Sequence, residues 1–138
     1  MKYPVIFALI AAFVVVGDAH AQATTVFRGR PSIKVSEAGR MRVPEEIPRS
    51  EAINLETVIS RIGDEFYWAS RGNVRMVLIE SGAFLNYVAV TGGGYVRVIP
   101  RDAKEVASML SETEAEFDYV EHMIHGLGSV TYWGERQP

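Results

Sequence analysis

The sequence contains no cysteine among its 138 residues. A chain without thiols forms no disulfide, offers no thiolate ligand to a metal and has no cysteine nucleophile. Disulfide scaffolds, thiolate zinc sites, thiol catalysis and lipid attachment through a cysteine are therefore excluded. The fold has to be stabilised by packing and hydrogen bonds.

The sequence also lacks an apolar run long enough to span a membrane. The stretch from Pro4 to Gly17 has 14 residues, whereas a spanning helix needs about 20. Lys2 before this run and the small residues before Ala21 and Ala23 are typical of a secretory signal peptide, cleaved after one of these alanines. We expect residues 1–21 to be removed, leaving a periplasmic or secreted protein that is not a lipoprotein and has no membrane span.

The charge is small overall, a net −3, but it is unevenly distributed. Residues 22–50 carry six Lys or Arg and three Asp or Glu, and residues 51–138 carry seven and thirteen. Prolines in the first part favour a loosely packed basic arm or linker, and the remainder is long enough for one domain. An acidic body lacks the electrostatic attraction on which nucleic-acid binding depends, so no nucleic-acid partner is expected.

Residues 51–63 carry apolar side chains at helical spacing, at positions 55, 58, 59 and 62. Ser50 or Asn54 is available as an N-cap, and Gly63 as a C-terminal stop. This pattern predicts an amphipathic helix with one buried face.

Aromatic and β-branched residues dominate four further segments, 66–71, 74–80, 83–90 and 95–99. Glycine, asparagine and serine in the short connections accept the positive φ that tight hairpins require. Connections this short cannot carry a parallel crossover, so we predict four antiparallel strands in a meander.

Capping-box patterns at residues 102–105 and 113–116 predict one or two helices that reach His125. Residues 129–133 have strand character and are expected to pair with an edge of the meander. The predicted fold class is therefore α+β: one helix, a four-stranded antiparallel meander, one or two helices and a short C-terminal strand. Residues 51–138 would form this single domain.

A candidate metal site lies on the predicted C-terminal helix. Asp118, Glu121, His122 and His125 would share one side of it, where carboxylates and imidazoles can bind zinc. The histidines are three residues apart, unlike the pair in H-E-x-x-H, and the opposite face is apolar. The alternative interpretation is an ordinary amphipathic helix with a solvated acidic face.

Two other motifs carry little chemistry. Thr91-Gly92-Gly93-Gly94 has the composition of a phosphate-binding loop, but a strand follows it instead of a helix, which favours a hairpin turn. The sequence has no G-x-S-x-G motif of a serine hydrolase. We expect no cofactor.

Aromatic and arginine side chains of the predicted sheet form a candidate binding surface. Strand alternation puts Tyr95 and Arg97 opposite Val96 and Val98, so the first pair lies on the open face if helices cover the valines. Residues of the same types that are expected to extend this surface are Tyr67, Arg71 and Trp133. The alternative is that these aromatics only stabilise the sheet through stacking and cation–π contacts.

Two functions follow from these observations. The first, which we favour, is a non-enzymatic binding module that uses a sheet face or sheet edge to bind a protein, a peptide or an envelope polymer. The second is a small metal-assisted hydrolase that uses the side of the predicted helix bearing His122 and His125.

Overall fold

The computed structural model describes residues 22–100 and 116–138. Strands make up 65% of this part and helical turns 11%. The strands are, in chain order, β1 (Thr24–Ala38), β2 (Met41–Glu46), β3 (Thr57–Ile62), β4 (Glu65–Trp68), β5 (Val74–Ser81), β6 (Phe84–Ala89), β7 (Gly94–Val98), β8 (Tyr119–His125) and β9 (Gly128–Arg136). The helical elements are α1 (Arg49–Ala52) and the 3₁₀ turns η1 (Ile53–Leu55) and η2 (Ala69–Arg71).

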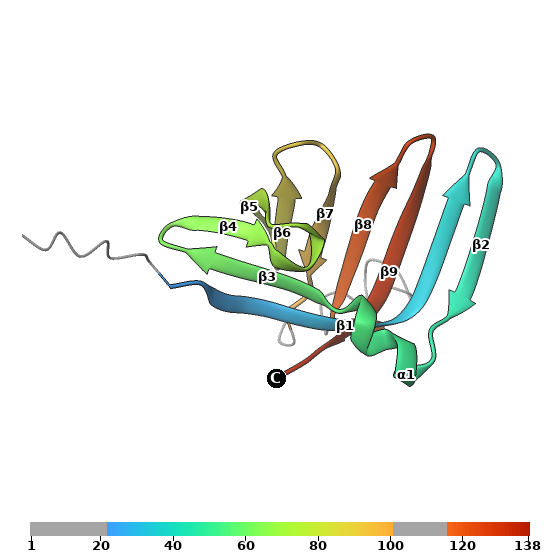
Figure 1. The fold of residues 1–138 in the computed structure, drawn as a ribbon, viewed down its shortest axis with the longest axis horizontal. Coiled ribbons are helices and arrows are strands. Elements are labelled where there is room, and N and C mark those ends of the chain that lie inside the picture. The colour runs from blue at the N-terminus through green and yellow to red at the C-terminus, as the bar shows by residue number, and fades with distance from the viewer. Residues whose placement is uncertain (1–21, 101–115) are drawn as a thin grey trace, which may run out of the picture.

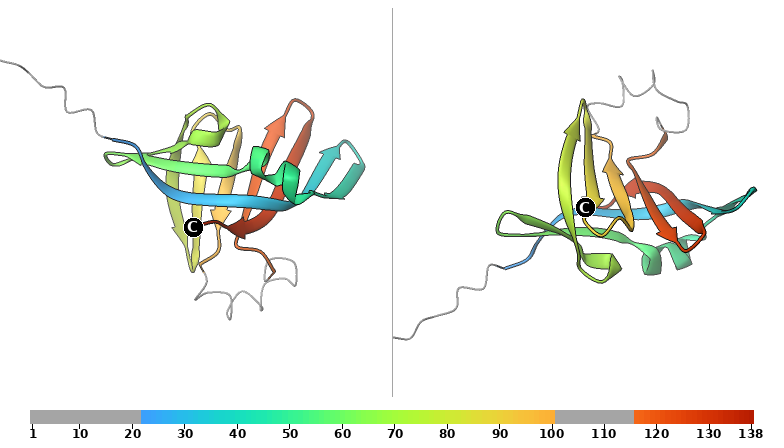
Figure 2. Two further views of the ribbon diagram at one scale, coloured as in Figure 1. Left: turned by 60° about the horizontal axis from the view of Figure 1, so that its bottom comes forward. Right: turned by 90° about the horizontal axis from the view of Figure 1, so that it is seen from above.

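Eight of the strands close into an antiparallel barrel. The sheet runs in the order β2-β1-β3-β4-β5-β6-β7-β8-β9, and β1 also pairs with β9. Closure is possible because β1 is long: its first part pairs with β3 and its second part with β9. β1 accordingly runs along one side of the molecule (Figures 1 and 2). β2 lies outside the barrel, against the second part of β1.

The barrel interior is filled by one cluster of buried side chains. Its members come from seven of the eight barrel strands and are Phe27, Ile59, Trp68, Met76, Tyr87, Ala89, Val96, Val98 and Tyr119. Gly29 of β1 allows the ring of Tyr119 to lie directly on its backbone, because a Cβ at this position would run into that ring. The core is therefore built from the inward-facing side chains of neighbouring strands, which alternate with outward-facing ones along each strand.

One carboxyl group is buried with this core. Glu121 of β8 is 0% exposed; its Oε1 accepts a hydrogen bond from Trp68 Nε1 and its Oε2 one from an Arg71 guanidinium nitrogen, both at 2.7 Å. Burial raises the pKa of Glu121, and the Arg71 charge opposes that shift. The Thr57 and Tyr119 hydroxyls are also buried, close to this carboxylate.

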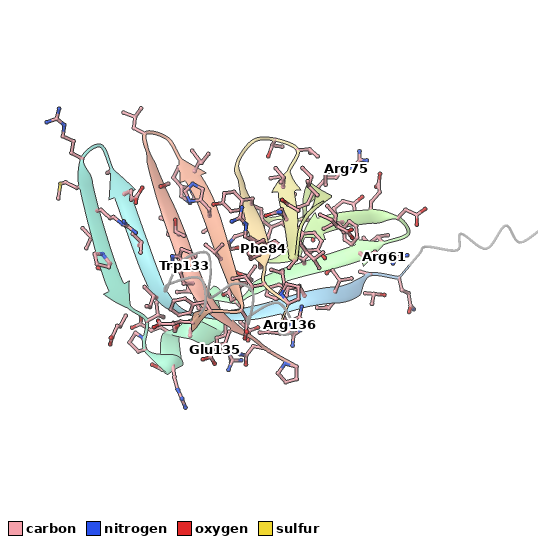
Figure 3. The ribbon with its side chains drawn as sticks, turned by 180° about the vertical axis from the view of Figure 1, so that it is seen from behind. Arg61, Arg75, Phe84, Trp133, Glu135 and Arg136 are labelled. Carbon is pink, nitrogen blue, oxygen red and sulfur yellow. The ribbon has the colours of Figure 1, made fainter. Side chains whose placement is uncertain are left out.

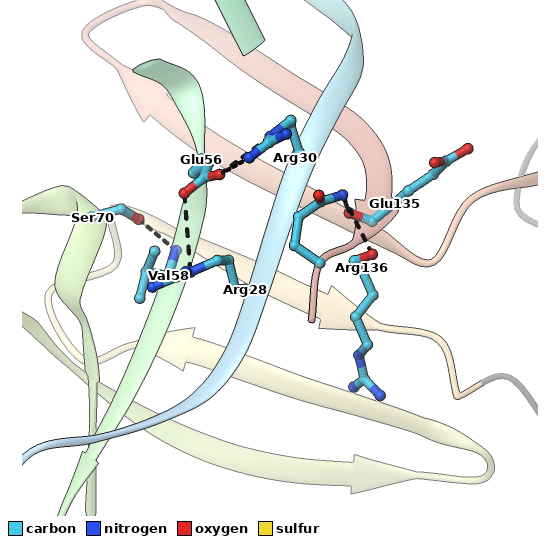
Figure 4. A network of polar contacts seen from close by, with 8 residues as sticks. Arg28, Arg30, Glu56, Val58, Ser70, Glu135 and Arg136 are labelled. Atoms are coloured by element: carbon cyan, nitrogen blue, oxygen red, sulfur yellow. Dashed lines mark hydrogen bonds and ion pairs between the residues drawn. The ribbon is translucent and has the colours of Figure 1, made fainter. Parts of the chain in front are cut away.

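Ion pairs join the start of β3 to β1. Glu56 accepts hydrogen bonds from Arg30, the shorter at 2.6 Å, and lies 4.0 Å from Arg28 (Figure 4). In the same region Ser70 Oγ accepts a hydrogen bond from the Val58 N–H at 2.9 Å. These contacts hold Glu56 against β1 and η2 against β3.

The predicted α+β class is wrong, since the described chain is mostly strand. The four strands expected between residues 66 and 99 are present as β4 to β7, but they form half of a closed sheet and not a separate meander. The expected C-terminal strand is β9, and it pairs with β8 and β1 instead of an edge of the meander.

Strand replaces the second half of the first predicted helix and most of the described part of the second. Within 51–63 the helix ends at Ala52 and η1 follows it. The β-branched residues Thr57, Val58 and Ile59 then begin β3, which pairs with β1 along its length and with β4 from Ile59 onward. The segment predicted as the end of the second helix forms strand β8, which pairs with β7 and β9. Its remaining part, and the signal peptide, lie outside the described residues.

The segment interpreted as a basic arm belongs to the sheet. Residues 24–46 form β1 and β2, and β1 places Phe27 and Val35 among the buried residues. Its charges are compatible with this place because most of them project from the barrel surface. Among the residues that the structure describes, no helix is both long and apolar enough to cross a membrane.

Candidate binding groove on the outer face

A shallow groove of about 210 Å³ crosses the outer face of the barrel. It is lined by side chains that alternate with the core residues on β7, β8 and β9 and on the second part of β1. Its lining includes Tyr95, Arg97, His122, Thr131 and Trp133. The registers explain their meeting: Tyr95 is opposite His122, which is opposite Thr131, and Val120 lies between Arg97 and Trp133. We call these five residues the outer groove.

A stacked pair of rings forms the centre of the outer groove. The rings of Tyr95 and His122 are 5.3 Å apart at an interplanar angle of 29°. His122 Nδ1 lies 2.9 Å from Thr131 Oγ1 and shares a hydrogen bond with it. Both rings are half-buried, so part of each ring stays accessible to solvent. This arrangement presents flat apolar surface beside polar atoms.

Arg97 and Trp133 lie on the second row of the groove. Arg97 Nε donates a hydrogen bond to Asn86 Oδ1 at 2.8 Å, and its guanidinium lies 5.4 Å from the ring centroid of Phe84. The ring of Trp133 packs at 5.8 Å against that of Phe117. Phe84 and Trp133 are labelled in Figure 3, on β6 and β9. Neighbouring side chains therefore hold both residues in place before any ligand arrives.

The groove has a hydroxyl next to an imidazole, which is also how a nucleophile and its base are placed. A catalytic arrangement needs a third group that orients the imidazole. In the described structure the other side of His122 is stacked on Tyr95, and no carboxylate bonds to its ring. The carboxylate lining the groove, Glu37, is paired with Arg42 at 3.3 Å. The described residues therefore do not complete a triad around His122.

Two of the five predicted surface residues lie elsewhere. Arg71 belongs to η2, where the chain leaves the strand after Trp68, so alternation no longer applies and its guanidinium turns toward Glu121. Tyr67 is on the outer side of β4, with its hydroxyl bonded to Glu65. Thr131 and His122, which complete the groove, were not predicted as part of this surface. The alternation of side chains along residues 129–133 could have placed Thr131 on the same face as Trp133.

The predicted metal ligands do not converge. On a strand, side chains three residues apart point to opposite faces, so His122 and His125 diverge. Asp118 shares the outer parity of His122, but its Oδ2 accepts the N–H of Arg136 at 2.9 Å. No group of three metal-binding side chains occurs in residues 22–100 and 116–138. The zinc hypothesis required a helix that places these side chains on one side. The segment forms strand β8 instead.

A larger hollow, of about 330 Å³, lies between β1 and α1. Arg30, Ser32, Arg49 and Gln137 are among its lining residues. Arg30 is already paired with Glu56, and Glu135 adds a carboxylate to the wall. It lacks the stacked rings of the outer groove, which is therefore the stronger candidate.

Comparisons with known proteins identify no relative of this chain: no family model matches it, and neither a curated protein nor a solved structure is similar enough to match.

Proposed function

We propose that this protein is an exported, non-enzymatic binding module, acting in the periplasm or outside the cell, whose outer groove binds a protein, a peptide or an envelope polymer. The observation that carries this proposal is the meeting of Tyr95, His122 and Trp133 with Arg97 on the outer face. These residues come from three strands and are not members of the buried core cluster.

The groove chemistry defines what such a ligand must offer. Aromatic faces accept flat apolar groups, and guanidinium, imidazole and hydroxyl groups bond to oxygen atoms. Peptides and polysaccharides both present apolar faces alternating with oxygen acceptors. Because the ring pair and Arg97 are already held by their neighbours, binding costs little side-chain entropy.

The sheet face is a better candidate than the sheet edge. β2 has one neighbour in the described sheet, so its other edge is free. The Ile47 N–H bonds to Ser32 O at 2.8 Å, which directs the backbone groups of Arg42, Pro44 and Glu46 away from β1. Pro44 has no N–H to donate, and charged residues flank it. Natural edge strands use both features to prevent pairing with another chain.

The test uses affinity capture from an envelope extract with wild-type protein, Tyr95→Ala, Arg97→Ala and the control Tyr67→Ala. Tyr67 is an outer-face tyrosine on β4, away from the groove. We expect a partner retained by wild-type and Tyr67→Ala to be lost from the two groove variants while their circular dichroism spectra stay unchanged. Retention by both groove variants would move the site elsewhere.

A further inference from the structure

Three turns lie side by side at one end of the sheet. They join β1 to β2, β6 to β7 and β8 to β9, and Figure 1 shows all three at the same end. The Ile124 N–H bonds to Gly93 O at 3.0 Å, which links the second turn to the third. Ala38 pairs with Gly128, which links the third to the first. We call residues 39–43, 90–93 and 124–128 the rim.

The rim gathers exposed apolar side chains. Half of the large hydrophobic residues that are exposed in the described structure belong to it: Met41, Val43, Val90, Ile124 and Leu127. Leu127 is fully exposed and Met41 is 69% exposed. Side chains exposed to this degree stabilise the folded barrel very little, and apolar groups gathered on a surface mark a contact with something else.

The geometry of the β8–β9 turn does not require a leucine at position 127. The β8–β9 turn has two residues, and Gly126 supplies its positive φ of 55°. The second position of such a turn accepts small polar residues without strain. The Leu127 side chain is fully exposed, so its packing does not stabilise the barrel.

The charges of the rim have one sign. Its fourteen residues include Arg40 and Arg42 and no Asp or Glu, whereas the whole chain has 17 Asp or Glu and 14 Lys or Arg. The carboxylate facing the rim from the adjoining part of β1 is Glu37, and it is paired with Arg42. Arg40 is exposed. An acidic protein therefore ends in an apolar, basic rim.

We propose that the rim docks onto an anionic lipid bilayer, with Leu127, Met41 and Val90 entering the interface between headgroups and acyl chains. The apolar side chains belong to three separate turns, each of which contains glycine. A fluid interface accepts side chains at a common height without shape complementarity, whereas a protein partner requires a contiguous matching surface. The basic residues complement the negative lipid surface.

A hollow between two of the hairpins supports this choice. It has a volume of about 280 Å³ and is lined by Met41, Val43, Val130 and His125, among others. The surface that it exposes is mostly apolar, although Ser36, Glu37 and Ser129 also belong to its lining. An acyl chain is a hydrocarbon chain and is suited to an apolar surface.

The experiment measures co-sedimentation with vesicles of phosphatidylcholine and phosphatidylglycerol, and with vesicles of phosphatidylcholine alone. The protein used lacks residues 1–21, whose apolar run would itself bind lipid. The nine strands of the described chain all follow this segment. We expect binding to the mixed vesicles that falls at high salt. Leu127→Ser should lower the partition coefficient about tenfold or more, because the leucine no longer enters the interface.

A matched pair of variants isolates the rim. Ile124 and Ile79 are 52% and 51% exposed, but Ile79 lies on β5, toward the opposite end of the sheet. Ile124→Ser should weaken vesicle binding and Ile79→Ser should not. Wild-type protein that stays in the supernatant, or equal losses from both isoleucine variants, would overturn the proposal. So would self-association in analytical ultracentrifugation that Leu127→Ser abolishes without vesicle binding, because the rim would then join two copies.

This inference is independent of the outer groove. Tyr95→Ala should keep vesicle binding, and Leu127→Ser should keep the partner captured through the groove. The two proposals can therefore fail separately.

Discussion

The two faces of β8 differ in what they do. Inward, Tyr119 and Glu121 are buried in the barrel, and the polar atoms of Glu121 are bonded to Trp68 and Arg71. Outward, His122 is half-buried in a shallow groove and Ile124 is exposed at the rim. The inner face accounts for the fold, whereas His122 and Ile124 on the outer face keep part of their surface accessible. Substitutions on the inner face should therefore change stability and those on the outer face should change binding.

The largest expected effect is that of Glu121→Ala. Removing this carboxylate leaves Arg71 and the indole N–H of Trp68 without their acceptor inside the barrel. We expect a loss of about 3 kcal/mol in the free energy of unfolding, measured in urea. Glu121→Gln keeps an acceptor for Trp68 and should lose less.

The control for this effect is Glu37→Ala. Glu37 pairs with Arg42 on the surface, where both side chains are well exposed, and such a pair contributes about 1 kcal/mol or less. Similar losses from Glu121→Ala and Glu37→Ala would show that the buried carboxylate has no special role.

An intermediate effect is expected on the pH dependence of stability. Burial raises the pKa of Glu121 above the ordinary 4.5, so the folded state holds this proton more tightly than the unfolded state does. The resulting contribution to stability is complete below about pH 4.5 and is lost as the pH rises through the folded-state pKa. The difference in the free energy of unfolding between wild type and Glu121→Gln should fall across that window. A difference that is flat from about pH 4 to about pH 7 would contradict the raised pKa.

The smallest effect is expected for Leu127→Ser. Its side chain is fully exposed in a turn, so the free energy of unfolding should change by about 0.5 kcal/mol or less. The same variant should lose vesicle binding. A large loss of stability would place Leu127 in the folding core instead of at a docking rim.

Part of this fold was predictable from local patterns. Turn residues between 66 and 99 and strict alternation along residues 95–98 located β7 and placed Tyr95 and Arg97 on the outer face, opposite Val96 and Val98. The helix over 119–125 was wrong because the apolar residues there fit a helical face as well as a strand. Glu121 is an inward-facing residue whose burial depends on Trp68 and Arg71, which are about 50 positions away.

The candidate site was predictable to the same extent. Alternation identified Tyr95 and Arg97, and residue type drew attention to Trp133. Pairing of β7 with β8 and of β8 with β9 then added His122 and Thr131. Arg71 was misplaced because η2 ends the alternation after Trp68.

By itself the sequence determined the absence of disulfides and thiol chemistry, the positions of several tight turns and the side on which each residue of β7 points. These properties depend on residue type and on neighbours a few positions apart. Only the tertiary structure decided that residues 24–38 form a strand that closes a barrel, that Glu121 is buried and that three turns form one rim. Each of those outcomes depends on pairing between distant segments, which local preference leaves open.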